Sequence, residues 1–196
     1  MLSYASIGEI KASDRLNITD TTSDNILTDV IEAVSRWIDD QTGRRFDSVT
    51  ETRYFTSENS RILNCDDIAT ATGLLLYTDD GGDGTVEITW SSTDYNLRPY
   101  NRRDGWPYEA IEVTYNGLYA FPRVRRGVKI TATFGWPSVP PQIKQACLLQ
   151  SERMFKRFAT PLGSSGMSAL GEVRLSIPAA DGDVMALLAP FMRLME

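Results

Sequence analysis

One amphipathic helix, predicted over residues 24–42, constrains the fold of this chain more than any other segment. At about 100° per residue, its large apolar side chains fall within one arc narrower than half of the helix surface: Ile26, Leu27, Val30, Ile31, Val34, Trp37 and Ile38. Such a helix must bury this face against other elements. We therefore expect Trp37 to lie in a core between this helix and a second one, although the pattern specifies no chemistry.

Both ends of the helix carry capping signals. Ser23 is a suitable N-cap, and Gly43 stands where a left-handed residue commonly ends a helix. On the polar face, Glu32, Arg36 and Asp40 have the i,i+4 spacing of stabilising ion pairs.

The segments that follow predict an α+β fold. Between residues 50 and 135 the hydrophobic period changes from 3.6 to 2, which predicts strands at 50–56, 74–78, 86–90, 94–99, 111–115 and 128–134. Pro140 and Pro141 then open a helix over about 142–158, since proline in the first turn loses no hydrogen bond. A short helical turn is also expected near 7–12. We predict two core helices packed on each other, an antiparallel β subdomain inserted between them, and a flexible C-terminal arm.

The expected domain boundaries follow from these elements. A core domain spans 1–158, with helical parts at 1–46 and 140–158 and a β-rich part at 50–135. Residues 159–171 are mostly small, as in a flexible linker. Residues 172–196 form the arm, with a short strand expected at its start.

Composition narrows the class of protein. The 196 residues are 42% hydrophobic, which is enough for one sizeable domain and an appendage. No apolar run approaches the roughly 20 residues that span a bilayer, so we expect no membrane association. Cys65 and Cys147 lack metal-ligand spacing and are predicted to be buried thiols.

The sequence contains no histidine, which removes the commonest general base and the usual zinc ligand. We therefore expect a non-catalytic protein without a cofactor or a metal. The net charge of −6 argues against a tight grip on nucleic acid phosphates. It is compatible with a channel through which DNA slides.

A glycine-rich acidic segment lies between two predicted strands. Asp79, Asp80 and Asp83 resemble the start of a calcium loop, but such a loop needs a Glu six residues after its glycine. Here Glu87 is only three residues past Gly84. The pattern favours a hairpin turn, with a weak cation site as the alternative.

Two arginine clusters are interleaved with aromatic residues, one at 98–103 and one at 123–126. Arginine among aromatic side chains is typical of protein interfaces and also of single-strand binding by stacking. Nearby carboxylates favour protein contact over nucleic acid or a plain solvated loop. Arg123, Arg125 and Arg126 are therefore predicted to bind a partner.

The C-terminal segment is too apolar to remain uncovered. Five of its side chains are predicted to bind a partner: Val184, Leu187, Leu188, Phe191 and Leu194. Folding back onto the core domain is the alternative. Under the partner-binding interpretation, deletion of residues 180–196 leaves the 1–158 domain folded.

The order of three segments resembles one known family. They are Thr42-Gly-Arg-Arg-Phe46 at the end of the first helix, the strand pair at 52–55 and 94–97, and Phe134–Ala146 at the start of the second helix. Over roughly residues 9–158 the chain resembles the head–tail connector (adaptor) proteins of long-tailed bacteriophages. Its large β insert departs from the shortest, all-helical members.

The resemblance implies a structural protein of the virion neck, assembled in the bacterial host cytoplasm. Members form a homo-oligomeric ring, usually dodecameric, that docks beneath the portal protein. The ring extends the DNA channel toward head-closure or tail proteins, and DNA passes through it without tight binding. A head-closure or tail-terminator ring protein is the nearest alternative. A calcium- or carbohydrate-binding β module is the alternative from another class.

Overall fold

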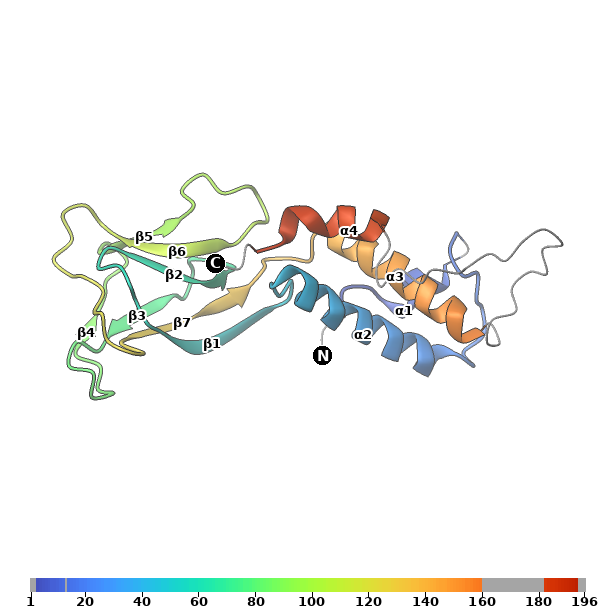
Figure 1. Ribbon diagram of the computed structural model, residues 1–196, viewed down its shortest axis with the longest axis horizontal. Coiled ribbons are helices and arrows are strands. Elements are labelled where there is room, and N and C mark those ends of the chain that lie inside the picture. The colour runs from blue at the N-terminus through green and yellow to red at the C-terminus, as the bar shows by residue number, and fades with distance from the viewer. Residues whose placement is uncertain (1–2, 13, 160–181, 194–196) are drawn as a thin grey trace, which may run out of the picture. The chain divides into compact units, whose positions relative to one another are not determined.

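The computed structural model describes residues 3–12, 14–159 and 182–193. The chain divides into two compact units, which we call the helical unit (Met1–Arg44 with Val139–Glu196) and the β unit (Arg45–Ser138). Figure 1 shows helices in the first and an antiparallel sheet in the second. The predicted α+β class is confirmed, with the β unit inserted between two helical segments. The predicted linker and the start of the arm lie outside the described residues, from 160 to 181.

Two long helices of equal length pack on each other in the helical unit. Its elements are α1 (Ile7–Lys11), α2 (Asp24–Thr42), α3 (Pro141–Ala159), α4 (Gly182–Leu188) and the 3-10 helix η1 (Ala189–Phe191). The main contacts join α2 to α3 and α4 to α3, as Figure 1 shows. The packing of α2 on α3 confirms the predicted pair of core helices.

The buried face of α2 is rotated from the predicted one. Leu27 and Ile38 lie at its centre and are fully buried. Ile26 is 48% exposed and Trp37 is only partly buried, because both lie at one margin of the buried arc. The prediction that Trp37 is a core residue is therefore wrong.

Ser35, at the opposite margin, is buried in place of those side chains. Its hydroxyl donates a hydrogen bond to the Ile31 carbonyl at 2.7 Å and accepts one from the Tyr4 amide at 3.1 Å. Ser35 Oγ also lies 3.6 Å from Cys147 Sγ on α3, and burial raises the pKa of that thiol. A serine can occupy this core position because its polar atom is fully partnered.

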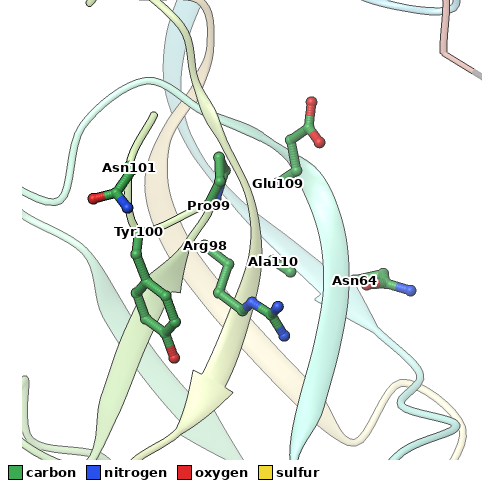
Figure 2. Close-up of a pocket in the computed structure, with 7 residues that line it drawn as sticks. All are labelled: Asn64, Arg98, Pro99, Tyr100, Asn101, Glu109 and Ala110. Atoms are coloured by element: carbon green, nitrogen blue, oxygen red, sulfur yellow. The ribbon is translucent and has the colours of Figure 1, made fainter. Parts of the chain in front are cut away.

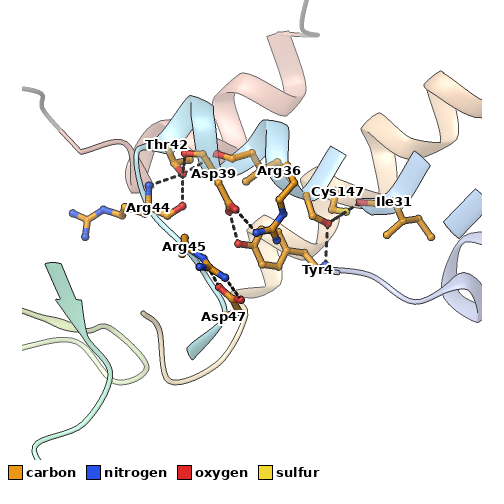
Figure 3. Close-up of polar contacts among 11 residues, drawn as sticks. Tyr4, Ile31, Arg36, Asp39, Thr42, Arg44, Arg45, Asp47 and Cys147 are labelled. Atoms are coloured by element: carbon orange, nitrogen blue, oxygen red, sulfur yellow. Dashed lines mark hydrogen bonds and ion pairs between the residues drawn. The ribbon is translucent and has the colours of Figure 1, made fainter. Parts of the chain in front are cut away.

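The ends of α2 follow the sequence in part. Gly43 has φ +64°, so the predicted left-handed C-terminal residue is confirmed. Ser23 occupies the N-cap position without a side-chain capping bond. Arg36 does not follow the expected i,i+4 spacing, since it forms an ion pair with Asp39 at 2.8 Å. Figure 3 shows this pair beside Tyr4.

The β unit contains seven antiparallel strands in the described residues. They are β1 (Ser48–Phe55), β2 (Ile62–Ile68), β3 (Leu75–Thr78), β4 (Ile88–Thr89), β5 (Tyr95–Arg98), β6 (Tyr108–Val113) and β7 (Val128–Gly135). The sheet order is β4-β3-β7-β2-β6-β5, and β1 pairs with β7. The six predicted strands are present, and β2 is an additional one.

The two ends of the β unit's chain meet around Trp136. This side chain packs on Phe46 and Trp106 at ring-centroid distances of 5.1 and 4.9 Å, and its indole N–H donates to the buried Asp67 carboxylate at 3.0 Å. Gly135 has φ +103°, and a Cβ there would lie 1.9 Å from the Asp47 carbonyl oxygen. Only glycine allows this close approach of β7 to the start of β1.

No helix within the described residues combines the length and the apolar character that a membrane crossing requires.

Candidate partner-binding site

Two segments that are separate in sequence lie together at one edge of the β unit. We call them the Asp turn (residues 79–87, between β3 and β4) and the Arg loop (residues 114–127, between β6 and β7). The Asp79 amide donates to the Gly127 carbonyl at 2.8 Å. A Cβ on Gly82 would lie 2.8 Å from Val124 Cγ1, so the turn is packed tightly against the loop. The sequence gives no sign of this pairing.

The Arg loop is irregular but firmly held. Phe121 is buried and stacks on Trp90, with ring centroids 5.0 Å apart and an interplanar angle of 10°. The Phe121 amide donates to the Ser60 carbonyl at 2.8 Å, and the Arg126 amide donates to Thr56 Oγ1 at 2.9 Å. These anchors fix the backbone from which the loop's arginine side chains project.

The Asp turn is a hairpin turn, as predicted, and its carboxylates hold it closed. Asp79 accepts hydrogen bonds from the amides of Gly82 and Gly84 at 2.6 and 2.8 Å. Glu87 accepts from the Asp80 amide at 2.6 Å. Asp83 accepts from the Thr85 amide at 2.8 Å, which lowers the pKa of Asp83.

One oxygen from each of Asp79, Asp83 and Glu87 lies within 4.8 Å of the others. The hydrogen bonds to the turn's own amides explain why these carboxylates converge. The convergence therefore gives no independent support to the calcium-binding alternative.

All three predicted arginines of the loop are exposed. The Arg126 guanidinium lies over the Tyr54 ring, 4.8 Å from its centroid. Arg123 and Arg125 form no ion pair with any residue that the structure describes. A hollow of about 350 Å³ is lined by residues of both segments and of the neighbouring strands, among them Arg125, Arg126, Lys129, Asp79 and Asp83. Such guanidinium groups can bind carboxylates through two parallel hydrogen bonds.

The tip of the Arg loop exposes apolar side chains that the sequence analysis missed. Tyr115 is 90% exposed and Leu118 is 93% exposed. A tight turn presents them, in which the Gly117 amide donates to the Thr114 carbonyl at 2.8 Å, and Arg61 donates to the Tyr115 carbonyl at 3.0 Å. Exposed apolar groups next to arginine are typical of protein interfaces.

The predicted partner-binding residues of the arm have a different environment. Val184 and Leu188 are fully buried within the helical unit, Phe191 is 4% exposed, and Leu187 is partly buried. The Arg193 amide donates to the Thr42 carbonyl at the end of α2 at 2.8 Å. Leu194 lies outside the described residues. These apolar side chains are therefore covered by their own chain.

A second hollow, of about 500 Å³, lies over β5 and β6 of the β unit (Figure 2). It is lined by Asn64, Arg98, Pro99, Tyr100, Asn101, Glu109 and Ala110. At its edge the Tyr100 hydroxyl donates to the Glu112 carboxylate, which raises the pKa of Tyr100. The Arg98 Nε lies 3.8 Å from the same carboxylate. The described residues of this lining offer hydrogen-bonding groups but no thiol and no serine or threonine hydroxyl.

Comparison with known proteins shows a shared fold. The chain is similar to one from the neck of an empty gene transfer agent (GTA) particle, a structure computed with C6 symmetry, with 18% identity, a TM-score of 0.56, and coverage of 96% of this chain and 89% of that chain. It is also similar to a chain from the virion of a native GTA particle, with 21% identity, a TM-score of 0.50, and coverage of 89% and 80%.

The sequence comparisons add little to the structural ones. No curated protein matches the sequence. The profile of the periviscerokinin family matches only residues 116–124, at the tip of the Arg loop, which is too small a part of the chain to show a family.

Proposed function

We propose that this protein is a structural component of a phage-like virion and occupies its neck, between head and tail. The observation that carries the proposal is the fold, which a chain from the neck of a GTA particle shares over 96% of this chain. The likeness covers nearly the whole chain, so it extends over both the helical and the β unit. The absence of histidine from the sequence agrees with a non-catalytic role.

Within the neck, we propose the role of a ring-forming connector. The ring docks beneath the portal protein and extends the DNA channel toward the head-closure or tail proteins. The exposed Arg loop supports this role, because ring subunits need surfaces for neighbours. The loop combines exposed guanidinium groups, of which Arg123 and Arg125 form no ion pair with a described residue, with exposed Tyr115 and Leu118. The net charge of −6 supports passage of DNA without tight binding.

The arm residues have only a secondary role in this proposal. Val184, Leu187, Leu188 and Phe191 contact a partner only if α4 leaves its position on α3, because most of their surface is covered by the helical unit. The Arg loop needs no such rearrangement. We therefore propose the loop as the principal interaction surface.

Native mass spectrometry and negative-stain imaging test the function directly. The protein is measured alone, with portal rings from the same virion, and with an unrelated ring protein of similar charge as the control. We expect a closed ring that forms on the portal and does not form on the control. A protein that stays monomeric with the portal, or that binds only assembled tails, contradicts the connector role.

A further inference from the structure

The side of α2 that faces away from its buried core residues carries a row of mostly exposed side chains. We call it the α2 stripe: Ile26, Asp29, Ala33, Trp37 and Asp40. At 100° per residue these side chains fall within an arc of about 80°. Ile26, Asp29, Ala33 and Asp40 are exposed, and Trp37 is partly exposed. The carboxylates of Asp29 and Asp40 therefore lie along one side of the stripe, and the apolar side chains lie along the other.

The carboxylates of the stripe are available to a partner. Asp29 and Asp40 form no ion pair with any residue in the described part of the chain. The neighbouring Arg36 does not neutralise them, because it pairs with Asp39 at 2.8 Å and lies over the Tyr4 ring, 5.5 Å from its centroid. The stripe thus has an acidic side and an apolar side.

The Arg loop has the complementary character. Its tip exposes Tyr115 and Leu118 almost completely, and Arg123 and Arg125 extend from the same anchored segment without an ion pair among the described residues. Apolar groups on one surface match apolar groups on the other, and guanidinium groups match carboxylates. The two surfaces belong to the same sequence but to different units of the chain.

We propose that the Arg loop of one copy binds the α2 stripe of the next copy, and that this contact builds the ring. The inference rests on the ring-forming function proposed above and names the surfaces that form its subunit contact. Since the two surfaces differ, their contact is heterologous, and repetition of a heterologous contact closes into a ring when the rotation allows it. A contact between identical surfaces would instead stop at a dimer.

A second copy fits the Arg loop better than DNA does. The apolar side of the α2 stripe can cover Tyr115 and Leu118 while its acidic side meets the arginines, whereas duplex phosphates offer no apolar surface. Binding of the loop to DNA is an outcome that the following experiment detects.

Charge reversal tests the contact. Two variants reverse one surface each: Arg123→Glu with Arg125→Glu on the loop, and Asp29→Arg with Asp40→Arg on the stripe. A third variant combines all four changes in one chain. The control, Arg103→Glu with Arg157→Glu, changes net charge by the same amount as the loop variant at two other exposed positions. Native mass spectrometry over a concentration series, alone and with portal rings, measures assembly.

Each single-surface variant is expected to need at least about a tenfold higher concentration for assembly, because like charges then face each other. The combined variant is expected to recover most of the wild-type assembly, and the control to assemble like the wild type. Thermal unfolding of every variant should stay within a few degrees of the wild type, since all substituted side chains are exposed.

Three results overturn the inference. They are unchanged assembly of both single-surface variants, failure of the combined variant to recover assembly, and selective loss of duplex DNA affinity in the loop variant. If the wild type forms rings in these cases, the proposed function stands and only the subunit contact is misassigned. A wild type that stays monomeric with and without the portal contradicts the proposed function as well.

Discussion

The C-terminal segment buries several of its apolar side chains, whereas the Arg loop leaves two of its own exposed. Residues 182–193 are nearly all apolar, yet Val184, Leu188 and Phe191 are buried within the helical unit. Residues 114–127 are rich in arginine and glycine, yet Tyr115 and Leu118 are the most exposed large apolar side chains that the structure describes.

The difference between them comes from spacing. Side chains 184, 188 and 191 recur at helical intervals, so α4 and η1 can turn all three toward α3 at once. In the Arg loop, the Thr114–Gly117 turn leaves Tyr115 exposed, while Phe121 is buried in the core and Tyr119 packs against it. A continuous apolar face predicts burial in the same chain, whereas single apolar residues on a rigid turn indicate contact with another molecule.

Among the tests of this comparison, deletion of residues 182–196 should have the largest effect on stability. The deletion removes the buried side chains of Val184, Leu188 and Phe191 and exposes the apolar surface that they cover. At about 1.5–3 kcal/mol for each large apolar side chain, the helical unit should lose at least about 5 kcal/mol. Urea denaturation followed by circular dichroism measures the change. This result would reverse the sequence-based expectation that the deletion leaves the core domain folded, and unaltered stability would show that α4 contributes nothing to it.

Substitution of Phe121, which anchors the Arg loop, should destabilise the protein nearly as much. Phe121→Ala removes a buried ring that stacks on Trp90, and such a change typically costs about 3–5 kcal/mol. Tyr115→Ala, in the same loop, should stay within about 0.5 kcal/mol of the wild type. Chemical denaturation of the two variants separates the anchor of the loop from its exposed tip. Equal effects would mean that the tip is packed in the free protein.

The variants Leu188→Ala and Leu118→Ala compare a buried leucine of the C-terminal segment with an exposed leucine of the Arg loop. Leu188→Ala should cost about 2–5 kcal/mol and leave the Arg loop intact. Leu118→Ala should leave the melting temperature unchanged and weaken assembly. Thermal unfolding and native mass spectrometry of both variants give the two measurements. A loss of stability in the second variant would contradict the contrast.

The smallest predicted effect concerns the ion pair between Glu9 and Lys144. Arg123 and Arg125, in contrast, form no ion pair with a described residue. The ion pair with Lys144, together with the Ser6 amide, lowers the pKa of Glu9 from 4.5 to about 2. Because the folded-state pKa is the lower one, the stabilisation is complete above pH 4.5 and is lost as pH falls toward 2.

Solvent screens this pair, since more than a third of the Glu9 side chain is exposed, so Glu9→Gln should cost less than about 1 kcal/mol at pH 7. The difference from the wild type should shrink between pH 4.5 and 2. Denaturation at several pH values measures it, with Glu58→Gln as an exposed control that should show no difference. A difference that is independent of pH would mean that the carboxylate charge is not involved.

Much of the fold could be predicted because it follows from local patterns. The helical period of α2 and the alternation in β7 both appear in the sequence. The rotation of α2 could not be predicted, because burial of Ser35 depends on the amide of Tyr4, 31 residues away. Strand β2 was missed for a similar reason. Its Asp66 and Asp67 are poor strand residues, and they are accommodated by Arg53 and Trp136, which lie far away in sequence.

The candidate site was predicted only in part. Arg123, Arg125 and Arg126 were identified from composition, and the structure places all three at the surface. Tyr115 and Leu118 were read as part of a strand end and a loop, although two apolar residues around Asn116 and Gly117 could have indicated an exposed turn. The packing of the Asp turn on Val124 is a long-range contact for which no local signal exists.

Disulfide trapping tests the central claim, that copies join through the Arg loop and the α2 stripe, most directly. Leu118→Cys and Ala33→Cys are introduced into one chain, since both positions are exposed and the native Cys65 and Cys147 are buried. Under oxidation, the account predicts a ladder of covalent multimers that ends at the ring, whereas each single substitution gives no ladder. If the wild type forms rings and the double variant yields only monomers or dimers, the claim is contradicted.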